Sequence, residues 1–128
     1  MAKTTQIPRD EWSDYFDNFT RQHLRNDLPD LVTLEVLSPR LGDQVYAQNA
    51  RLLGLSFDPH SEAFEVLIDG ADHMIFQPAE IWVLEGDTAV IAVFELVHAD
   101  GTKQLIHVKE GGPLVAAGTD AETGDEPS

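Results

Sequence analysis

The sequence predicts an α+β fold, in which one N-terminal amphipathic helix packs on a curved antiparallel sheet or small barrel of about six to eight short strands. Aromatic residues recur at helical spacing in one segment near the N-terminus. The rest of the chain consists of short apolar or alternating runs separated by turn signals. Because none of these later runs has helical periodicity, we expect consecutive strands to pair as an antiparallel meander.

The predicted helix spans about Arg9 to Arg25. If Pro8 caps it, Ile7 and Trp12 occupy the positions of a hydrophobic staple. Acidic residues fill the first turns and arginines the last, which suits the helix dipole. The aromatic stripe needs a surface to bury against, so we expect the helix on one face or at the open end of the sheet. The stripe consists of Trp12, Tyr15, Phe16, Phe19 and His23.

The predicted strands follow in order along the rest of the chain. Between the last two, Asp100-Gly101 is a strong hairpin signal, for which we expect a type I′ turn. The strands are Leu31–Leu37, Gln44–Ala47, Leu52–Phe57, Ala63–Ile68, Met74–Phe76, Ile81–Glu85, Ala89–His98 and Thr102–Val108.

The composition predicts one folded domain with two flexible ends. We expect a flexible N-terminus over residues 1–6, a single α+β domain over residues 7–110 and a disordered acidic tail over residues 111–128. The tail is rich in Gly, Pro and acids and lacks apolar periodicity.

Charge and composition exclude several classes of function. The formal charge is −15, and residues 52–102 hold ten acids and no Lys or Arg, which predicts one uniformly acidic face or set of loops. Nucleic acid is an unexpected partner for such a chain, because phosphates are bound mainly by Lys and Arg. Without cysteine there is no thiolate catalysis and no cysteine-ligated metal. Neither a signal peptide nor a membrane span is recognisable, so we expect no membrane partner and a cytoplasmic location.

One segment carries candidate acid–base chemistry. Asp72 and His73 precede a proline turn, and Glu80 follows it. If the turn folds back, Glu80 could hydrogen-bond to His73 and set its tautomer or proton affinity. The alternative is structural: Asp72 caps a turn, Pro78 fixes its geometry and Trp82 lies in the core.

Two further groups are weaker candidates. Arg21 or Arg25 could clamp an anion where the helix end meets the sheet, with His23 nearby; the alternative is that His23 only packs at the edge of the stripe. His98 and Asp100 could act together at a hairpin end, or form a solvated turn. The ligand-binding candidates are Arg21, His23, Asp72, His73 and Glu80.

Three stretches of the chain carry distinctive motifs. They are the opening I-P-R-D-E-W to F-T-R-Q-H over residues 7–23, D-H-M-I followed by P-A-E-I-W-V over residues 72–83, and A-D-G-T-K-Q over residues 99–104. These stretches resemble a family of small acidic bacterial proteins catalogued only as a domain of unknown function. The resemblance covers most of residues 7–109 and implies a free-standing bacterial domain, but it supplies no catalytic residue.

Three functions remain open from the sequence. The favoured one is a non-enzymatic binding or regulatory module for an unknown protein or small molecule, with a homodimer left open. The alternative is a metal-dependent or acid–base ligand-binding or enzymatic domain that uses the segment from Asp72 to Glu80. An acidic mimic of nucleic acid is the third. The chain carries no metal-binding motif, and we expect no cofactor.

Overall fold

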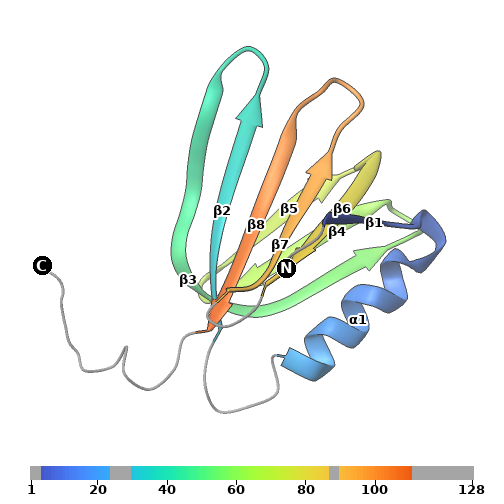
Figure 1. The fold of residues 1–128 in the computed structure, drawn as a ribbon, viewed down its shortest axis with the longest axis vertical. Coiled ribbons are helices and arrows are strands. Elements are labelled where there is room, and N and C mark those ends of the chain that lie inside the picture. Colours follow the sequence, from blue (N-terminus) through green and yellow to red (C-terminus); the bar gives the residue numbers. More distant parts are fainter. Residues whose placement is uncertain (1–3, 24–29, 87–89, 111–128) are drawn as a thin grey trace, which may run out of the picture.

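A computed structural model describes residues 4–23, 30–86 and 90–110 (Figure 1). Within these residues the strands form one eight-stranded antiparallel sheet in the order β1-β6-β7-β8-β2-β3-β4-β5. The predicted α+β class is confirmed, and the sheet is open, because β1 and β5 do not pair with each other. The elements are β1 (Thr4–Ile7), the 3-10 helix η1 (Arg9–Glu11), α1 (Trp12–His23), β2 (Asp30–Ser38), β3 (Gly42–Asp58), β4 (Ala63–Ile68), β5 (Ala71–Phe76), β6 (Glu80–Glu85), β7 (Val90–Val97) and β8 (Lys103–Glu110).

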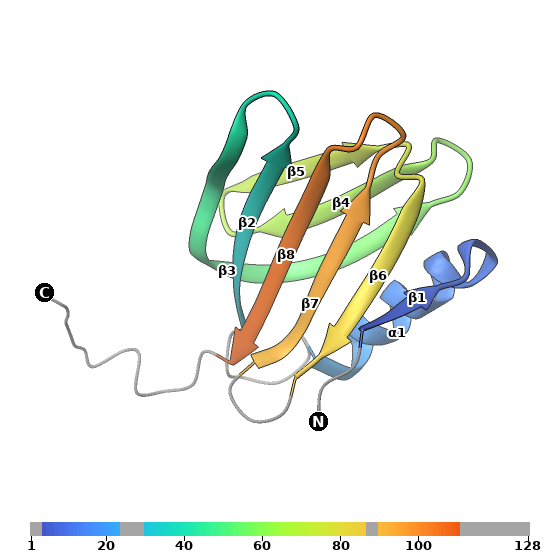
Figure 2. The same ribbon diagram turned by 45° about the horizontal axis from the view of Figure 1, so that its top comes forward.

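Strand β3 gives the sheet its shape. The sequence predicts two strands here, but the structure has one continuous strand of 17 residues that pairs with β2 in its first part and with β4 in its second. Its pairing register shifts between Leu52 and Gly54, and Asn49 has a positive φ of 52°. These irregularities bend the strand without breaking it. As a result, the later half of β3 with β4 and β5 crosses behind β6, β7, β8 and β2 (Figure 2).

The helix lies where the two parts of the sheet come together, and its aromatic stripe joins them. The ring of Phe16 packs edge-on against Phe64 of β4 at 4.7 Å and against Phe94 of β7 at 5.1 Å between centroids. Trp12 packs in the same way on Phe57 of β3, at 5.1 Å. All five side chains are buried. The stripe predicted from the sequence is therefore the central contact of the core, since edge-to-face ring pairs add to the burial of their area.

The start of the helix differs from the prediction in one detail. Arg9–Glu11 forms a 3-10 turn and the α-helix begins at Trp12. The predicted staple residues Ile7 and Trp12 are both buried, and the indole nitrogen of Trp12 donates to the Ile7 carbonyl at 2.8 Å. This bond ties the end of β1 to the first turn of α1. Arg25, at the predicted end of the helix, lies outside the described residues.

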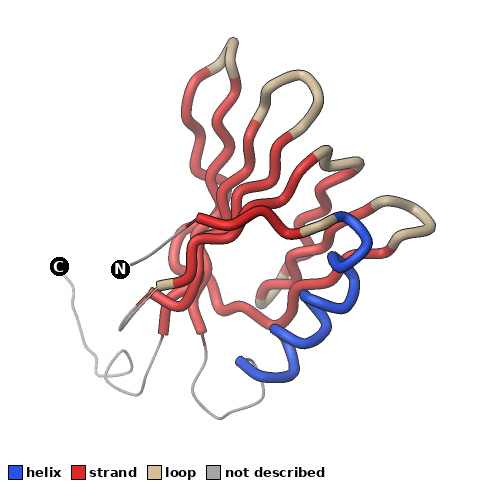
Figure 3. Tube along the Cα trace, turned by 45° about the vertical axis from the view of Figure 1, so that its right-hand side comes forward, coloured by secondary structure: helices blue, strands red, loops and turns tan. Residues whose placement is uncertain are grey.

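A threonine attaches the helix to an otherwise unpaired stretch of β3. The hydroxyl of Thr20 donates to the carbonyl of Leu55 at 2.8 Å and accepts its N–H at 3.1 Å. Beyond Leu52, β3 has no pairing with β2, so this edge would otherwise be open. Figure 3 shows α1 running beside this part of the sheet. The helix thereby substitutes for a neighbouring strand.

Two other predictions need correction. Residues 4–6 belong to β1, which pairs with β6, and are not part of a flexible end; Ile7 anchors this strand in the core. The loop between β7 and β8 is not a type I′ turn, because only Gly101, at 92°, has a positive φ. The Gly101 N–H bonds to the His98 carbonyl, and the His98 N–H to the Thr102 carbonyl, which is a type I turn followed by a left-handed glycine. The tail, residues 111–128, lies outside the described part.

The described helix is too short to cross a membrane, and no other helix of that part of the chain is long and apolar enough to do so.

Candidate functional site

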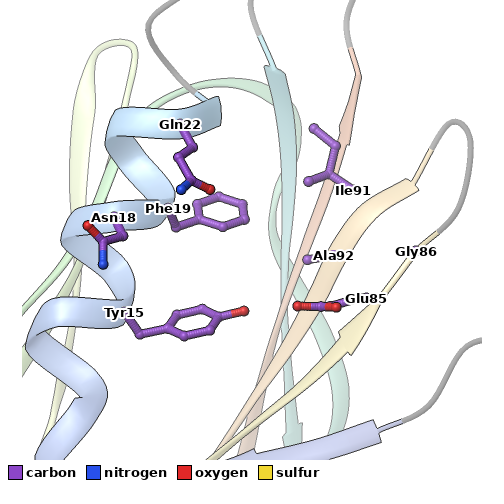
Figure 4. Close-up of a pocket in the computed structure, with 8 residues that line it drawn as sticks. All are labelled: Tyr15, Asn18, Phe19, Gln22, Glu85, Gly86, Ile91 and Ala92. Atoms are coloured by element: carbon purple, nitrogen blue, oxygen red, sulfur yellow. The ribbon is translucent and has the colours of Figure 1, made fainter.

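A cavity of about 380 Å³ lies between α1 and the adjoining ends of β6 and β7. This is within the usual size range of small-molecule sites. In Figure 4, Tyr15 and Phe19 project from the helix toward the side chains that β6 and β7 contribute. The cavity is lined by Tyr15, Asn18, Phe19, Gln22, Glu85, Gly86, Ile91 and Ala92.

A tyrosine from α1 and a glutamate from β6 approach each other at the wall of this cavity. The hydroxyl of Tyr15 points toward the carboxylate of Glu85 (Figure 4). Burial raises the pKa of Tyr15, and the negative charge of Glu85 and its hydrogen bond with the phenol raise that pKa further. The phenol therefore stays protonated, with its hydroxyl directed at the carboxylate, which keeps lone pairs for a ligand.

A second cavity, of about 230 Å³, lies on the other side of the same pair. It is lined by both Tyr15 and Glu85, together with β1, the turn after it and Glu11. Among the described residues that line the two cavities, acids are present and Lys and Arg are absent. Both spaces therefore favour a positively charged group over an anion.

The sequence-predicted segment does not converge on one point. His73 pairs in register with the buried Val66 and lies on the inner face of β5, so Asp72 lies on the outer face. Glu80 instead accepts a hydrogen bond from the indole of Trp82 at 2.9 Å. Within the described part of the chain, no group of three or more His, Asp or Glu side chains could hold a metal ion.

His73 instead belongs to a row of hydrogen-bonded side chains, the polar chain, that includes Gln104 and His98. Its Nε2 lies 2.9 Å from Oε1 of Gln104 on β8, and the amide nitrogen of Gln104 lies 3.0 Å from Nε2 of His98. The ring of Tyr46 packs edge-on against His73, with centroids 5.7 Å apart. Three strands separate β5 from β8 in the sheet, so this chain spans the concave face directly.

The basic candidates lie elsewhere. Arg21 is exposed on α1 and donates to the side chain of Asn18, a residue of the cavity wall, but it does not itself line the cavity. His23 is the last residue of α1 and lies beyond Gln22 of the cavity wall.

The hairpin candidate Asp100 lies in a turn. Asp100 accepts the backbone N–H of Thr102, which lowers the pKa of Asp100, and the nearby His98 lowers this pKa further.

Those acids of residues 52–102 that the structure describes do not form one uniform face. Glu62 pairs with Arg9 at 3.0 Å, and Glu95 pairs with Lys103 at 3.1 Å. Asp58 accepts hydrogen bonds inside a turn, from His60 and Ser61. Glu85 lines the cavity. Strand alternation and turn formation thus disperse acids that are close in the sequence.

The sequence reasoning assigned Tyr15 to the core and missed Glu85 as a site residue. A signal for Glu85 was present. Ile81 and Val83 are buried and alternate along β6, so Glu85 continues the same face of the strand at its exposed end. A carboxylate on the core-facing side of a strand needs a hydrogen-bond partner or water. Its presence there therefore indicates that the apolar core ends at that residue.

The family model and the relative that match this chain are both described without a function. A family model described as "Family of unknown function (DUF5335)" matches residues 3–115. An uncharacterized protein of Aquifex aeolicus (strain VF5) is 38% identical over 113 residues, which cover 87% of this chain and 96% of that protein. No solved structure matches significantly. The bacterial origin and the cytoplasmic location expected from the sequence stay predictions.

Proposed function

The chain belongs to the DUF5335 family of unknown function, and we propose that it is a non-enzymatic binding module that takes a small organic amine into the cavity beneath α1. The observation that carries this proposal is the approach of Tyr15 to Glu85 in the wall of a cavity of about 380 Å³. A carboxylate and a hydroxyl meet there beside a space with an apolar wall.

The charge of the cavity supports an ammonium group as the part that is recognised. Glu85 is the acid of the larger cavity, and no base lines it within the described residues. An ammonium donates three hydrogen bonds and forms charge-assisted bonds with a carboxylate. The rings of Tyr15 and Phe19 add a face on which a cation is attracted.

The apolar wall of the cavity indicates what the part of the ligand beyond the ammonium group should be. Phe19 and Ala92 are buried, and Ile91 is partly buried against the core. A short hydrocarbon chain fits such a wall, with about 0.8 kcal/mol of stabilisation for each buried methylene group. The expected class is therefore an alkylamine or diamine with a few carbon atoms.

Isothermal titration calorimetry with n-butylamine and 1,4-diaminobutane, in buffer of constant ionic strength, tests the proposal. We expect saturable binding to the full chain at one site. Glu85→Gln keeps the shape of the side chain and removes its charge, and should weaken binding by about 10- to 100-fold, since hydrogen bonds to charged groups contribute about 1.5–3 kcal/mol.

Asp17→Asn is the matched control. Asp17 is exposed on the same helix, does not line the cavity, and its substitution changes the net charge equally. Equal weakening in both variants would mean that amines bind only through the overall charge, and the proposal would be wrong. It would also be wrong if neither amine bound the wild-type chain.

The acid–base alternative now depends on His73 alone. Gln104 and His98 are its neighbours in the hydrogen-bonded chain, whereas Asp72 and Glu80 point elsewhere. The cavity beneath α1, which has a defined volume and converging polar groups, is for this reason the site that we propose.

A further inference from the structure

Strand β5 is one edge of the sheet. It pairs with β4 on one side, and among the described residues no other strand lies on its other side. An exposed edge presents unpaired N–H and C=O groups on which another extended chain can pair. The part of β3 beyond Leu52, which does not pair with β2, is not open in this way. There the hydroxyl of Thr20 bonds to both backbone groups of Leu55.

The ladder shows which backbone groups of β5 are unpaired. The Gln77 N–H donates to the Glu62 carbonyl, so these two residues form a hydrogen-bonded pair. In an antiparallel ladder such pairs alternate, and the register then makes Phe64–Ile75 and Val66–His73 hydrogen-bonded pairs as well. The backbone groups of the residues in between point away from β4. These residues are Asp72, Met74 and Phe76.

The side chains of the same three residues lie together on the outer face. Met74 is 40% exposed and Phe76 61%, and Leu67 on β4, across from Asp72, is 37% exposed. Exposed large apolar side chains on a free edge strand are unusual, because natural edges more often carry charges or proline to prevent pairing. The feature indicates a surface that a partner covers.

The charges next to this apolar group select the partner. Glu65 and Asp72 lie on the outer face, where Asp72 raises the pKa of Glu65 by a hydrogen bond between the two carboxyl groups, and burial and repulsion raise it further. A second copy of this chain would bring two more carboxylates to the seam, and it carries the same net charge of −15. Lysine or arginine on the incoming strand would relieve the repulsion instead.

We propose that the free edge of β5 binds an extended, basic segment of another protein, which adds as a ninth strand beside Asp72, Met74 and Phe76. Alternate residues of the segment would place basic side chains near Glu65 and Asp72. Main-chain hydrogen bonds supply the affinity, and the carboxylates and apolar side chains supply the specificity. The proposal does not involve the cavity beneath α1.

Fluorescence anisotropy with a labelled peptide of about nine alternating valine and lysine residues tests the edge. We expect saturable binding to the full chain. A peptide of the same sequence with an N-methyl group on every backbone amide keeps the charge but has no main-chain N–H to donate on either edge, and should bind at least tenfold more weakly. Equal affinity of the two peptides would show attraction by charge alone and would overturn the proposal, as would the absence of binding by the unmodified peptide.

A proline substitution locates the binding site on the protein. Met74→Pro removes an N–H that faces away from β4, and proline is tolerated on edge strands in that position. We expect about tenfold weaker peptide binding with unchanged ellipticity, whereas Met74→Ala, which keeps the N–H, should lose less. Asp72→Asn should weaken binding about threefold.

Light scattering tests the competing occupant. A wild-type dimer that Met74→Pro converts into a monomer would assign the edge to a second copy and overturn the proposal. Equal peptide binding by Met74→Pro and by the wild type would also overturn the proposal. A monomeric wild type whose peptide binding requires the Met74 N–H supports it.

Discussion

The two ends of the concave face of the sheet are built from different kinds of contact. At the end beneath α1, Trp12 and Phe16 are almost completely excluded from solvent and pack edge-to-face on rings from three strands. At the other end, Tyr46 is 59% exposed, and a hydrogen-bonded chain links His73 to Gln104. The comparison shows that one helix covers only part of a strongly bent sheet, and that side-chain amide and imidazole groups span the rest.

This difference predicts different effects of substitution at the two ends. The aromatic end holds large side chains that are completely buried, so substitutions there should affect folding. The hydrogen bonds of the polar end are only partly buried, and their groups can exchange partners for water at little cost. The proposed amine cavity lies at the margin of the aromatic end, where Tyr15 and Glu85 replace core residues.

The largest effect is expected for Phe16→Ala, which breaks the aromatic end. Phe16 is fully buried between β4 and β7, so the substitution removes transfer free energy and leaves a cavity. We expect the free energy of unfolding to fall by about 3–5 kcal/mol. Urea unfolding followed by circular dichroism measures it. A loss below 1 kcal/mol would mean that the helix is not the main contact between the two parts of the sheet.

A smaller loss is expected for Thr20→Val at the same end. Valine has the shape of threonine but cannot bond to the N–H and C=O of Leu55. Leaving these partly buried groups without a partner should cost about 1–2 kcal/mol. Hydrogen exchange should also show faster exchange of the Leu55 amide. Thr20→Ser, which keeps the hydroxyl, is the control, and its exchange rate should remain close to that of the wild type.

At the polar end, His73→Ala tests whether the hydrogen bonds there contribute less to stability than the aromatic contacts do. We expect a loss of less than about 1 kcal/mol, since the hydrogen bond of His73 to Gln104 is only partly buried. Amine binding should be unchanged, because His73 does not line either cavity beneath α1. Calorimetry on this variant checks both expectations. Lost amine binding would place the functional site at the polar end instead.

The smallest effect is a difference in alkaline stability. The folded state holds the proton of Tyr15 at pH values where the unfolded chain, with the ordinary tyrosine value of 10.0, has released it. The stability of the wild type should therefore decrease as the pH rises above about 10 toward the folded-state pKa. Tyr15→Phe should lose less over the same interval. Parallel urea titrations between about pH 8 and pH 11 measure the difference, and identical pH dependence would contradict it.

Much of the fold could be predicted from local periodicity. The helical spacing of Trp12, Phe16 and Phe19 identified the helix face that is buried, and alternation located most strands. The split of β3 into two strands was wrong, because polar residues such as Gln48 and Asn49 resemble a turn in the sequence. In the structure, pairing with β2 keeps them in one bent strand.

The candidate site was less accessible to such reasoning. Asp72 and His73 are neighbours in the sequence, but strand alternation places them on opposite faces, and their distance along the chain to Glu80 did not measure the distance in space. The inward position of Glu85 was visible in the pattern of β6. The sequence did not indicate that Tyr15 would be the residue that faces Glu85.

By itself, the sequence determined the aromatic face of the helix, the apolar strands, the family and the acidic charge. These depend on residue type and on spacing within one element, which local sterics and burial convert directly into structure. The tertiary structure alone decided that the sheet stays open, that β3 bends, that Tyr15 meets Glu85 and that β5 is left as an edge. These depend on which distant segments pair, and that is set by the summed packing of the whole chain.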